Sequence, residues 1–166
     1  IGGSTNAVIH LTAIAGRLGK KVSLETLNRL SDTTPMLVNL KPSGTHYMEH
    51  FFAAGGMGAV LRELKPLLHL DCLNISGQTL GERLEGEEGY VDYEVIRPLN
   101  DPVEPYGGLV SLFGSLAPQG AIIKRSAADS SLFERKGRAF VFHSLENLSS
   151  SIDDPELDVK PDDFLI

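Results

Sequence analysis

The stretch that decides the fold of this chain is Gly-Gly-Ser-Thr-Asn at residues 2–6, which runs directly into Ala-Val-Ile-His-Leu-Thr-Ala-Ile-Ala at residues 7–15. Small polar residues followed by apolar residues at helical spacing predict the start of an amphipathic helix. Ser4, Thr5 or Asn6 would each serve as its N-cap. Free backbone N–H groups and the positive end of the dipole lie at such a start, and glycine lets a ligand approach closely. The stretch therefore fits either an anion-binding helix start or plain capping.

Composition and charge restrict the class of protein. The 166 residues suggest one domain or the edges of two, and a hydrophobic content of 42% is enough for a core. Fifteen basic against twenty-two acidic residues give a net charge of −7, and no basic cluster forms, so nucleic acid is not an expected partner. Short, interrupted apolar runs predict neither a membrane span nor a signal peptide. The single cysteine, Cys72, is expected to be a buried structural thiol in a reducing, cytoplasmic protein.

The first half of the chain is predicted to be mostly helical, because its apolar residues recur every three or four positions. Ser23 is a good N-cap for a second, short helix, and glycine and proline punctuate the rest. The predicted helices cover residues 7–18, 24–30, 45–52, 59–64 and 79–84, and a short strand is predicted at 35–40.

The second half changes character, because short β-like runs separated by turn residues replace the helical spacing. Strands are predicted at 94–99, 108–113, 121–124 and 138–142, and another begins at 165–166. The turns between them are predicted at 107–108, 118–120 and 136–137.

We therefore expect an α/β protein, α+β within this chain. Residues 1–88 would form the mostly helical end of one domain, and residues 89–166 an incomplete β-barrel-like second domain. The chain opens on Ile1 and stops inside a predicted strand, so we also expect a piece of a longer protein.

Five ordered motifs resemble one known family. They are Gly-Gly-Ser-Thr-Asn at residues 2–6, Asn-Leu-Lys-Pro-Ser-Gly at 39–44, Met48-Glu49 leading to Ala-Gly-Gly at 54–56, Ser-Gly-Gln-Thr-Leu at 76–80, and Gly-Gly-Leu at 107–109 followed by Gly-Ser-Leu-Ala-Pro-Gln-Gly-Ala at 114–121. In this order and spacing they resemble the dihydroxy-acid and phosphogluconate dehydratases, a family that includes the sugar-acid (aldonate) dehydratases.

The resemblance implies a hydro-lyase. Such enzymes remove water from a 2,3-dihydroxy acid and give a 2-keto-3-deoxy acid. An iron–sulfur cluster acts on the departing hydroxyl, magnesium holds the substrate, and a serine takes the C2 proton. Metals suit this chemistry because hydroxide leaves poorly and the C2 proton is weakly acidic. The family fold joins an α/β domain to a β-barrel-like domain, and family members assemble as homo-oligomers.

The residues that the family uses for metal binding and catalysis are not expected in this chain. The resemblance places the cluster cysteines, the magnesium-binding aspartates and the metal-binding lysine before residue 2. It places the remaining magnesium ligand and the catalytic serine beyond Ile166. No metal ligand and no catalytic residue is therefore assigned here, and the isolated chain is expected not to catalyse the dehydration.

Ser4, Thr5 and Asn6 are the candidate substrate-binding residues, because the family active site lies between its two domains. His10 lies inside the first helix, where a core histidine with its hydrogen bonds satisfied is the expected role. The alternative is a catalytic histidine.

Five further polar residues are candidates for binding, and each has a structural alternative. Lys41 and Ser43 could face a substrate carboxylate, although a lysine in a turn is usually solvated. His46, Glu49 and His50 have metal-ligand spacing on a predicted helix, yet the resemblance supports no zinc site. That helix is expected to pack through positions 48, 51 and 52 instead.

Segments 46–52, 95–99 and 122–128 look more like the sugar-acid branch than the branched-chain amino-acid branch. The expected substrate is therefore an aldonate, with a branched-chain dihydroxy acid as the alternative. Two further alternatives are a truncated, non-catalytic binding or structural module, and a small anion-binding domain that uses residues 2–6.

Overall fold

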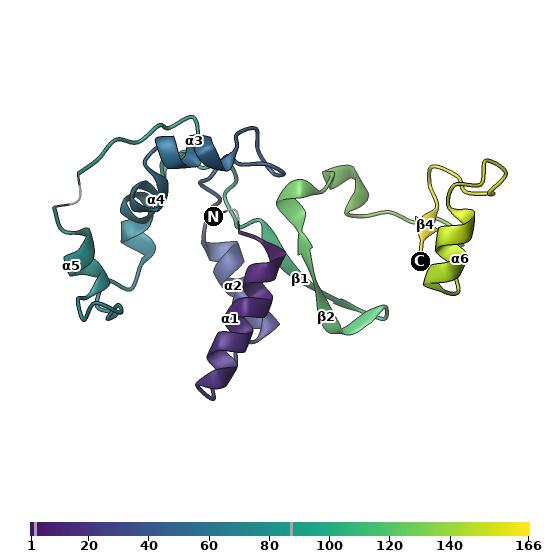
Figure 1. Ribbon diagram of the computed structural model, residues 1–166, viewed down its shortest axis with the longest axis horizontal. Coiled ribbons are helices and arrows are strands. Elements are labelled where there is room, and N and C mark those ends of the chain that lie inside the picture. Colours follow the sequence, from purple (N-terminus) through teal and green to yellow (C-terminus); the bar gives the residue numbers. More distant parts are fainter. Residues whose placement is uncertain (2, 87) are drawn as a thin grey trace. The chain divides into compact units, whose positions relative to one another are not determined.

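The computed structural model describes residues 1, 3–86 and 88–166. The chain forms two compact units, Ile1–Ala128 and Asp129–Ile166 (Figure 1). Helices and strands are mixed, as expected for an α/β protein, and the described residues form two two-stranded sheets rather than a closed barrel. The domain boundary between residues 88 and 89 stays a prediction.

Helices α1 and α2 begin at capping residues that the sequence predicts, whereas α3 begins three residues later and α4 three residues earlier than predicted. Ser4 Oγ accepts a hydrogen bond from the Asn6 N–H, and Ser23 Oγ accepts one from the Thr26 N–H. Thr79 forms a capping box with Glu82. The helices are α1 (Thr5–Arg17), α2 (Leu24–Thr33), α3 (Met48–Ala53), α4 (Gly56–Leu64) and α5 (Leu80–Leu84), and short 3-10 turns cover Lys65–Leu67 (η1) and Arg125–Ala127 (η2).

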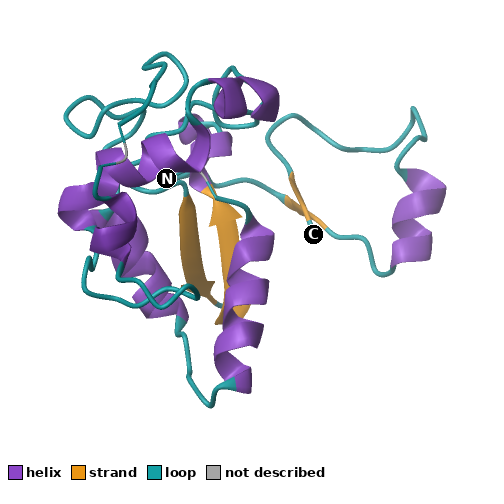
Figure 2. Ribbon diagram, turned by 60° about the vertical axis from the view of Figure 1, so that its left-hand side comes forward, coloured by secondary structure: helices purple, strands orange, loops and turns teal. Residues whose placement is uncertain are grey.

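A β-hairpin lies beside α1 and α2 (Figure 2). Its strands β1 (Leu109–Gly114) and β2 (Ala117–Lys124) pair antiparallel, with Leu109 opposite Lys124 and Gly114 opposite Ala117. The turn predicted at 118–120 is wrong, because those residues lie within β2. The chain reverses at 115–116 instead, and a glycine at each of positions 114 and 120 fits the irregular register between the strands.

The strands predicted at 35–40 and 94–99 are not formed, and only isolated bridges join these segments to others. Met36 pairs with Glu104, and Val38 pairs with Ile96. The N–H groups of Val95 and Ile96 both donate to the Asp92 carbonyl, so that segment is a turn. The apolar runs reflect burial in the core rather than regular pairing.

The core of the first unit lies among these two segments, α4 and the end of α3. Phe51 packs against it from α3, whereas the side chains of Met48 and Phe52 are 66% and 84% exposed. The prediction that positions 48 and 52 pack inward is therefore wrong. The buried cluster comprises Leu37, Val38, Ala54, Ala59, Val60, Leu64, Val95 and Ile96.

The second unit is a small parallel pair of strands with one helix. Strand β3 (Ala139–Phe140) pairs with β4 (Phe164–Leu165), each shorter or shifted by a residue relative to the prediction. A helix that was not predicted, α6 (Leu145–Ser151), lies between them in sequence, and a 3-10 turn covers Ser130–Leu132 (η3). Arg138 forms ion pairs with Asp158 and Asp163, which connect the residue before β3 to the segment that leads into β4.

Candidate functional site

The three predicted substrate-binding residues lie at the exposed start of α1. Ser4 is the N-cap, and its hydroxyl accepts the Asn6 N–H at 3.2 Å. The side chains of Thr5 and Asn6 make no hydrogen bond to other described residues. Two polar side chains are therefore available to a ligand at this helix start, and the third is committed to capping.

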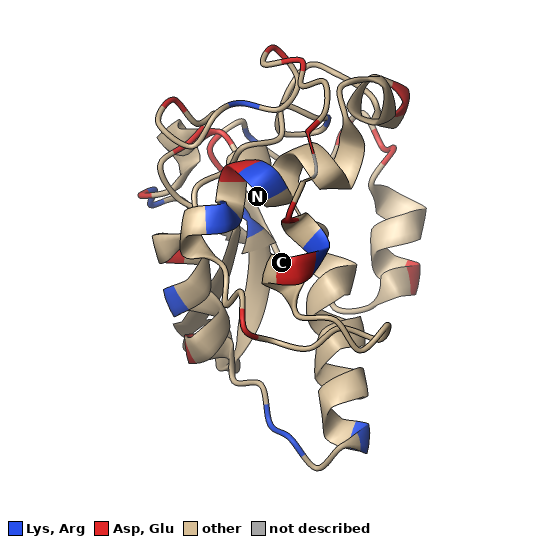
Figure 3. Ribbon diagram, turned by 90° about the vertical axis from the view of Figure 1, so that its left-hand side faces the viewer, with Lys and Arg blue, Asp and Glu red and all other residues tan. Residues whose placement is uncertain are grey.

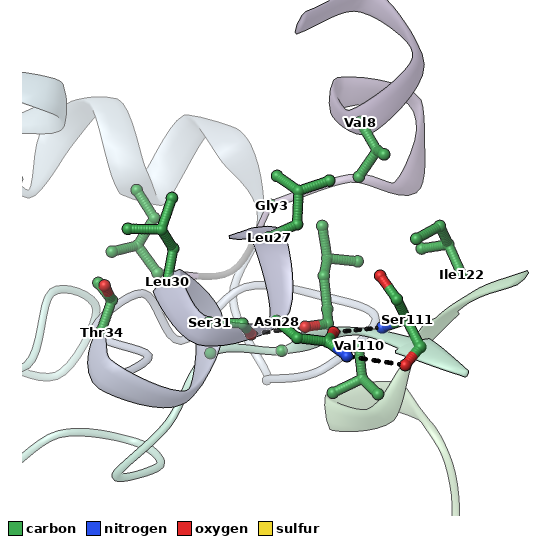
Figure 4. A pocket seen from close by; sticks show the side chains of 14 residues that line it. Gly3, Val8, Leu27, Asn28, Leu30, Ser31, Thr34, Val110, Ser111 and Ile122 are labelled. Carbon is green, nitrogen blue, oxygen red and sulfur yellow. Dashed lines mark hydrogen bonds between the residues drawn. The ribbon is translucent and has the colours of Figure 1, made fainter. Parts of the chain in front are cut away.

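A cavity of about 220 Å³ opens between the start of α1, helix α2 and strand β1 (Figure 4). Gly3 lies on its wall, where an added Cβ would stand 3.7 Å from Leu109 Cδ1. Val8, Leu27, Leu30 and Ile122 are among its apolar lining residues. The structure thus brings the first family-like motif next to the Gly-Gly-Leu motif at 107–109.

Two polar side chains of α2 on the wall of this cavity, Asn28 and Ser31, are occupied by hydrogen bonds to β1. Asn28 Nδ2 donates to the Ser111 carbonyl at 2.9 Å, and Asn28 Oδ1 accepts the Ser111 N–H at 2.6 Å. Ser31 Oγ donates to the Leu109 carbonyl at 2.5 Å. These bonds join α2 to the hairpin, and they leave the cavity with an apolar character.

Gly107 and Gly108 allow their own segment to approach the end of α2 on one side and η2 on the other. A Cβ at Gly107 would lie 2.5 Å from Ser31 Oγ, and one at Gly108 would lie 2.4 Å from Ser126 Oγ. Ser126 Oγ is in turn 2.8 Å from Ser43 Oγ. The turn at 41–44 and the segment 122–128, both singled out in the sequence, therefore meet beside the paired glycines.

Ser43 is half-buried, and its hydroxyl is paired with that of Ser126. It is therefore not free to bind a substrate carboxylate. Lys41 is exposed, and its Nζ donates to Tyr47 Oη at 2.5 Å. Tyr47 was not singled out in the sequence. The sequence pattern that could have indicated this contact is a tyrosine six residues after Lys41. Pro42 and Gly44 lie between them and turn the chain back.

Of the three residues with metal-ligand spacing, His46 and His50 lie together, with their ring centroids 5.4 Å apart. His50 Nδ1 accepts the Tyr47 N–H at 3.2 Å, so this nitrogen serves the start of α3. Across the described part of the chain, no group of three or more His, Cys, Asp or Glu side chains is placed to hold a metal ion.

Two expectations about single residues are wrong. His10 is exposed on α1 rather than part of the core, and no residue of this helix is buried. Cys72 is exposed as well. It lies in a turn that joins η1 to α5, where its carbonyl accepts the Leu80 N–H, and no apolar layer covers it.

Basic and acidic residues are interspersed along the chain (Figure 3). Arg125 is the basic residue most closely tied to the paired glycines. Its Nε donates to the Gly107 carbonyl, its guanidinium pairs with Asp32 at 3.0 Å, and it lies 4.2 Å from the Tyr106 ring centroid. No helix in the described ranges is long and apolar enough to cross a membrane.

The fold is a mixed helix–strand scaffold in which two glycine-containing motifs meet beside a helix start, and comparison with known proteins defines its class. The N-terminal domain model of the dihydroxy-acid/6-phosphogluconate dehydratases matches residues 1–83, and the C-terminal domain model matches residues 94–166. The chain belongs to the dihydroxy-acid/6-phosphogluconate dehydratase family.

Relatives named for a sugar acid and relatives named for a dihydroxy acid resemble the chain about equally. An L-arabonate dehydratase of Azospirillum brasilense is 45% identical over the whole chain, which covers 29% of that relative. A dihydroxy-acid dehydratase of Caldicellulosiruptor bescii is 44% identical over 92% of the chain, or 28% of the relative. An L-arabinonate dehydratase of Rhizobium leguminosarum is 45% identical over 96% of the chain. The chain spans less than a third of the length of the curated relatives it matches.

Proposed function

We propose that this chain is part of a hydro-lyase that dehydrates a sugar acid (aldonate) to a 2-keto-3-deoxy acid, and that it is inactive by itself. The observation that carries the proposal is the match of both family domain models, in order, along the chain. Relatives named as L-arabonate and L-arabinonate dehydratases support the choice of an aldonate.

A branched-chain 2,3-dihydroxy acid is the second candidate substrate. The dihydroxy-acid dehydratase of Caldicellulosiruptor bescii is as similar to the chain as the aldonate dehydratases are. The cavity beside the start of α1 also has an apolar lining, which suits an alkyl group better than a row of hydroxyls. A non-catalytic binding or structural module is the remaining alternative.

The residues of this chain do not fit the cofactors that the resemblance implies. An iron–sulfur cluster needs several thiolates, and the sequence has one cysteine. A magnesium ion needs grouped oxygen ligands, and the described residues bring no three carboxylates together. We propose that the complete enzyme holds an iron–sulfur cluster and Mg²⁺ through residues outside this chain.

We propose that Thr5 and Asn6 bind the hydroxy-acid substrate and that Ser4 holds the helix start in place for them. The support is geometric, since the first two side chains are exposed and uncommitted while Ser4 accepts the Asn6 N–H. The complete enzyme would be a cytoplasmic homo-oligomer that contacts neither nucleic acid nor membrane.

The test begins with the mass and peptide map of the protein from its native source, followed by assay of that protein. Formation of 2-keto acid from L-arabonate, and less from a branched-chain 2,3-dihydroxy acid, would support the proposal. The reverse preference would favour the second candidate. A purified native protein of 17.9 kDa that converts neither substrate would contradict the enzyme function.

The role of the helix start is tested in the same assay by Thr5→Val, with Thr12→Val as the matched control. Thr12 is exposed on the same helix, away from its start. Loss of a substrate hydrogen bond should raise KM about tenfold in the first variant only. Equal KM values in both variants would remove Thr5 from the binding site.

A further inference from the structure

Four side chains around the turn at 41–47 form a cluster of hydrogen-bond donors. Lys41 Nζ donates to Tyr47 Oη at 2.5 Å and lies 4.2 Å from the centroid of the tyrosine ring. The ring of Tyr47 lies 6.1 Å from that of His50, and His50 lies 5.4 Å from His46. The four groups are therefore contiguous. Lys41 begins the turn, His46 and Tyr47 end it, and His50 lies in the first turn of α3.

Each group in the cluster has a donor left over. Tyr47 Oη accepts from the lysine, so its own proton is free to donate. His50 Nδ1 accepts the Tyr47 N–H, which leaves Nε2 as the ring nitrogen that can donate. The side chain of His46 makes no hydrogen bond to described residues, and two ammonium protons of Lys41 remain.

The positive charge of Lys41 is not neutralised within the described part of the chain. Arg97, Arg125 and Arg138 form ion pairs with aspartates, whereas Lys41 forms none, as is also true of other exposed lysines such as Lys20. What distinguishes Lys41 is its contact with Tyr47. Glu49, in the first turn of α3, is the nearest acidic residue in sequence and forms no ion pair with it. In a chain of net charge −7, an uncompensated cation surrounded by donors suits an anionic ligand.

The turn that carries the cluster is held in one conformation. The Gly44 N–H donates to the Leu40 carbonyl at 2.8 Å, and the Lys41 N–H donates to the His46 carbonyl at 2.9 Å. Asn39 Oδ1 accepts the Thr45 N–H at 3.0 Å, and Ser43 pairs with Ser126. Because the backbone is already fixed, a ligand would not have to order it on binding.

We propose that Lys41, Tyr47, His46 and His50 form a binding site for the carboxylate of a small hydroxy acid. The lysine ammonium pairs with the carboxylate, and the tyrosine hydroxyl and the imidazoles donate to its second oxygen or to the neighbouring hydroxyl. One permanent positive charge matches a monoanionic carboxylate better than a phosphate dianion. The choice of a hydroxy acid rests on the proposed function, but binding here requires no turnover.

The test is an NMR titration of the chain with sodium gluconate, sodium lactate and sodium phosphate at constant ionic strength. Saturable shifts of the Tyr47 amide and of the His46 and His50 imidazoles with gluconate and lactate are expected. In Lys41→Gln the affinity should fall about tenfold. Lys20→Gln removes the same charge from another exposed site and should bind as the original chain does.

Tyr47→Phe keeps the ring and removes only the hydroxyl, so it tests the site if Lys41→Gln does not fold. It should weaken binding of both hydroxy acids. Absence of saturable shifts, or equal shifts in Lys41→Gln and the original chain, would overturn the proposal. Tighter binding of phosphate than of either carboxylate would overturn the assigned ligand. None of these readouts measures dehydration, so failure here leaves the proposed reaction standing.

Discussion

Asn28 pairs with both backbone groups of Ser111, donating to its carbonyl at 2.9 Å and accepting its N–H at 2.6 Å, so a side chain of α2 hydrogen-bonds to β1 as a neighbouring strand would. Ser111 is 5% exposed, and water cannot readily replace these bonds. These hydrogen bonds explain how α2 and the β1–β2 hairpin pack together although the core is small.

Asn28→Ala should lower the free energy of unfolding by about 2 kcal/mol, because it leaves a buried N–H and a buried carbonyl without partners. Asn100→Ala is the control, since Asn100 is exposed, and it should change stability by less than about 0.5 kcal/mol. Urea unfolding followed by circular dichroism measures both. Equal midpoints for the two variants would show that the pairing contributes nothing.

Gly44→Ala should destabilise the first unit by more than about 1 kcal/mol. Its Cβ would stand 2.2 Å from Asn39 Oδ1 and 2.6 Å from the Asn39 carbonyl carbon, so the turn would have to shift. Gly16→Ala, on α1, meets nothing within 4 Å and should instead stabilise by up to about 1 kcal/mol through helix propensity. Opposite shifts in melting temperature are expected, and an unchanged or raised melting temperature in Gly44→Ala would contradict the assigned conformation of the turn.

Stability of the second unit should fall as the pH drops from about 4 to about 2. Hydrogen bonds from Arg138, and one from the Lys160 N–H, lower the pKa of Asp163 from 3.8 to about 2. A carboxyl with a lowered folded-state pKa stabilises the fold above its unfolded pKa, and that stability is lost on protonation. Carboxyl carbon NMR should record the Asp163 titration near pH 2, and Arg138→Gln should move it upward. A midpoint near 3.8 in the original chain would refute the pairing.

The isolated chain should self-associate through α1. Ile9, Ile14 and Leu18 are 67%, 62% and 75% exposed on this helix, while its other side faces β2. A helix with apolar residues on both sides is stable only when both are covered. Sedimentation should show a mass above 17.9 kDa, and Ile9→Lys with Ile14→Lys should reduce it. Arg17→Lys keeps the charge and serves as the control, and a monomer at all concentrations would contradict the expectation.

The sequence predicted most of the helices because capping and spacing are local signals. The structure confirms Ser23 as an N-cap and selects Ser4 from the three candidates at the first helix start. Thr79, predicted as the first residue of its helix, is the N-cap of α5. Helix α6 was missed although Ser144 caps it in the same way, because polar residues fill much of its length and weaken the apolar period. Residues 94–99 were mistaken for a strand because burial produces apolar runs in turns as well as in strands.

The polar contacts of the candidate site were less accessible to prediction. The serine pair Ser43 and Ser126 depends on tertiary approach beside Gly108, and no local pattern encodes it. Asn28 did carry a signal, since it is an amide beside leucines on the packed side of α2, where a polar group needs a buried partner. The sequence limited the N-cap of α1 to Ser4, Thr5 or Asn6, and the structure selects Ser4. The exposure of His10 and Cys72 depended on which sides of the structure are covered.

The hydrogen bonds between Asn28 and Ser111 and between Ser43 and Ser126 each span 83 residues, which has a consequence for the order of folding. Helices α1 and α2 can form soon after synthesis, but neither bond can close until the hairpin has left the ribosome. Closing such long loops costs chain entropy before any contact compensates for it, so docking of the hairpin should be the slow step. Until then the side of α2 that will meet β1 stays uncovered, and a chaperone would find its binding surface there rather than at the termini.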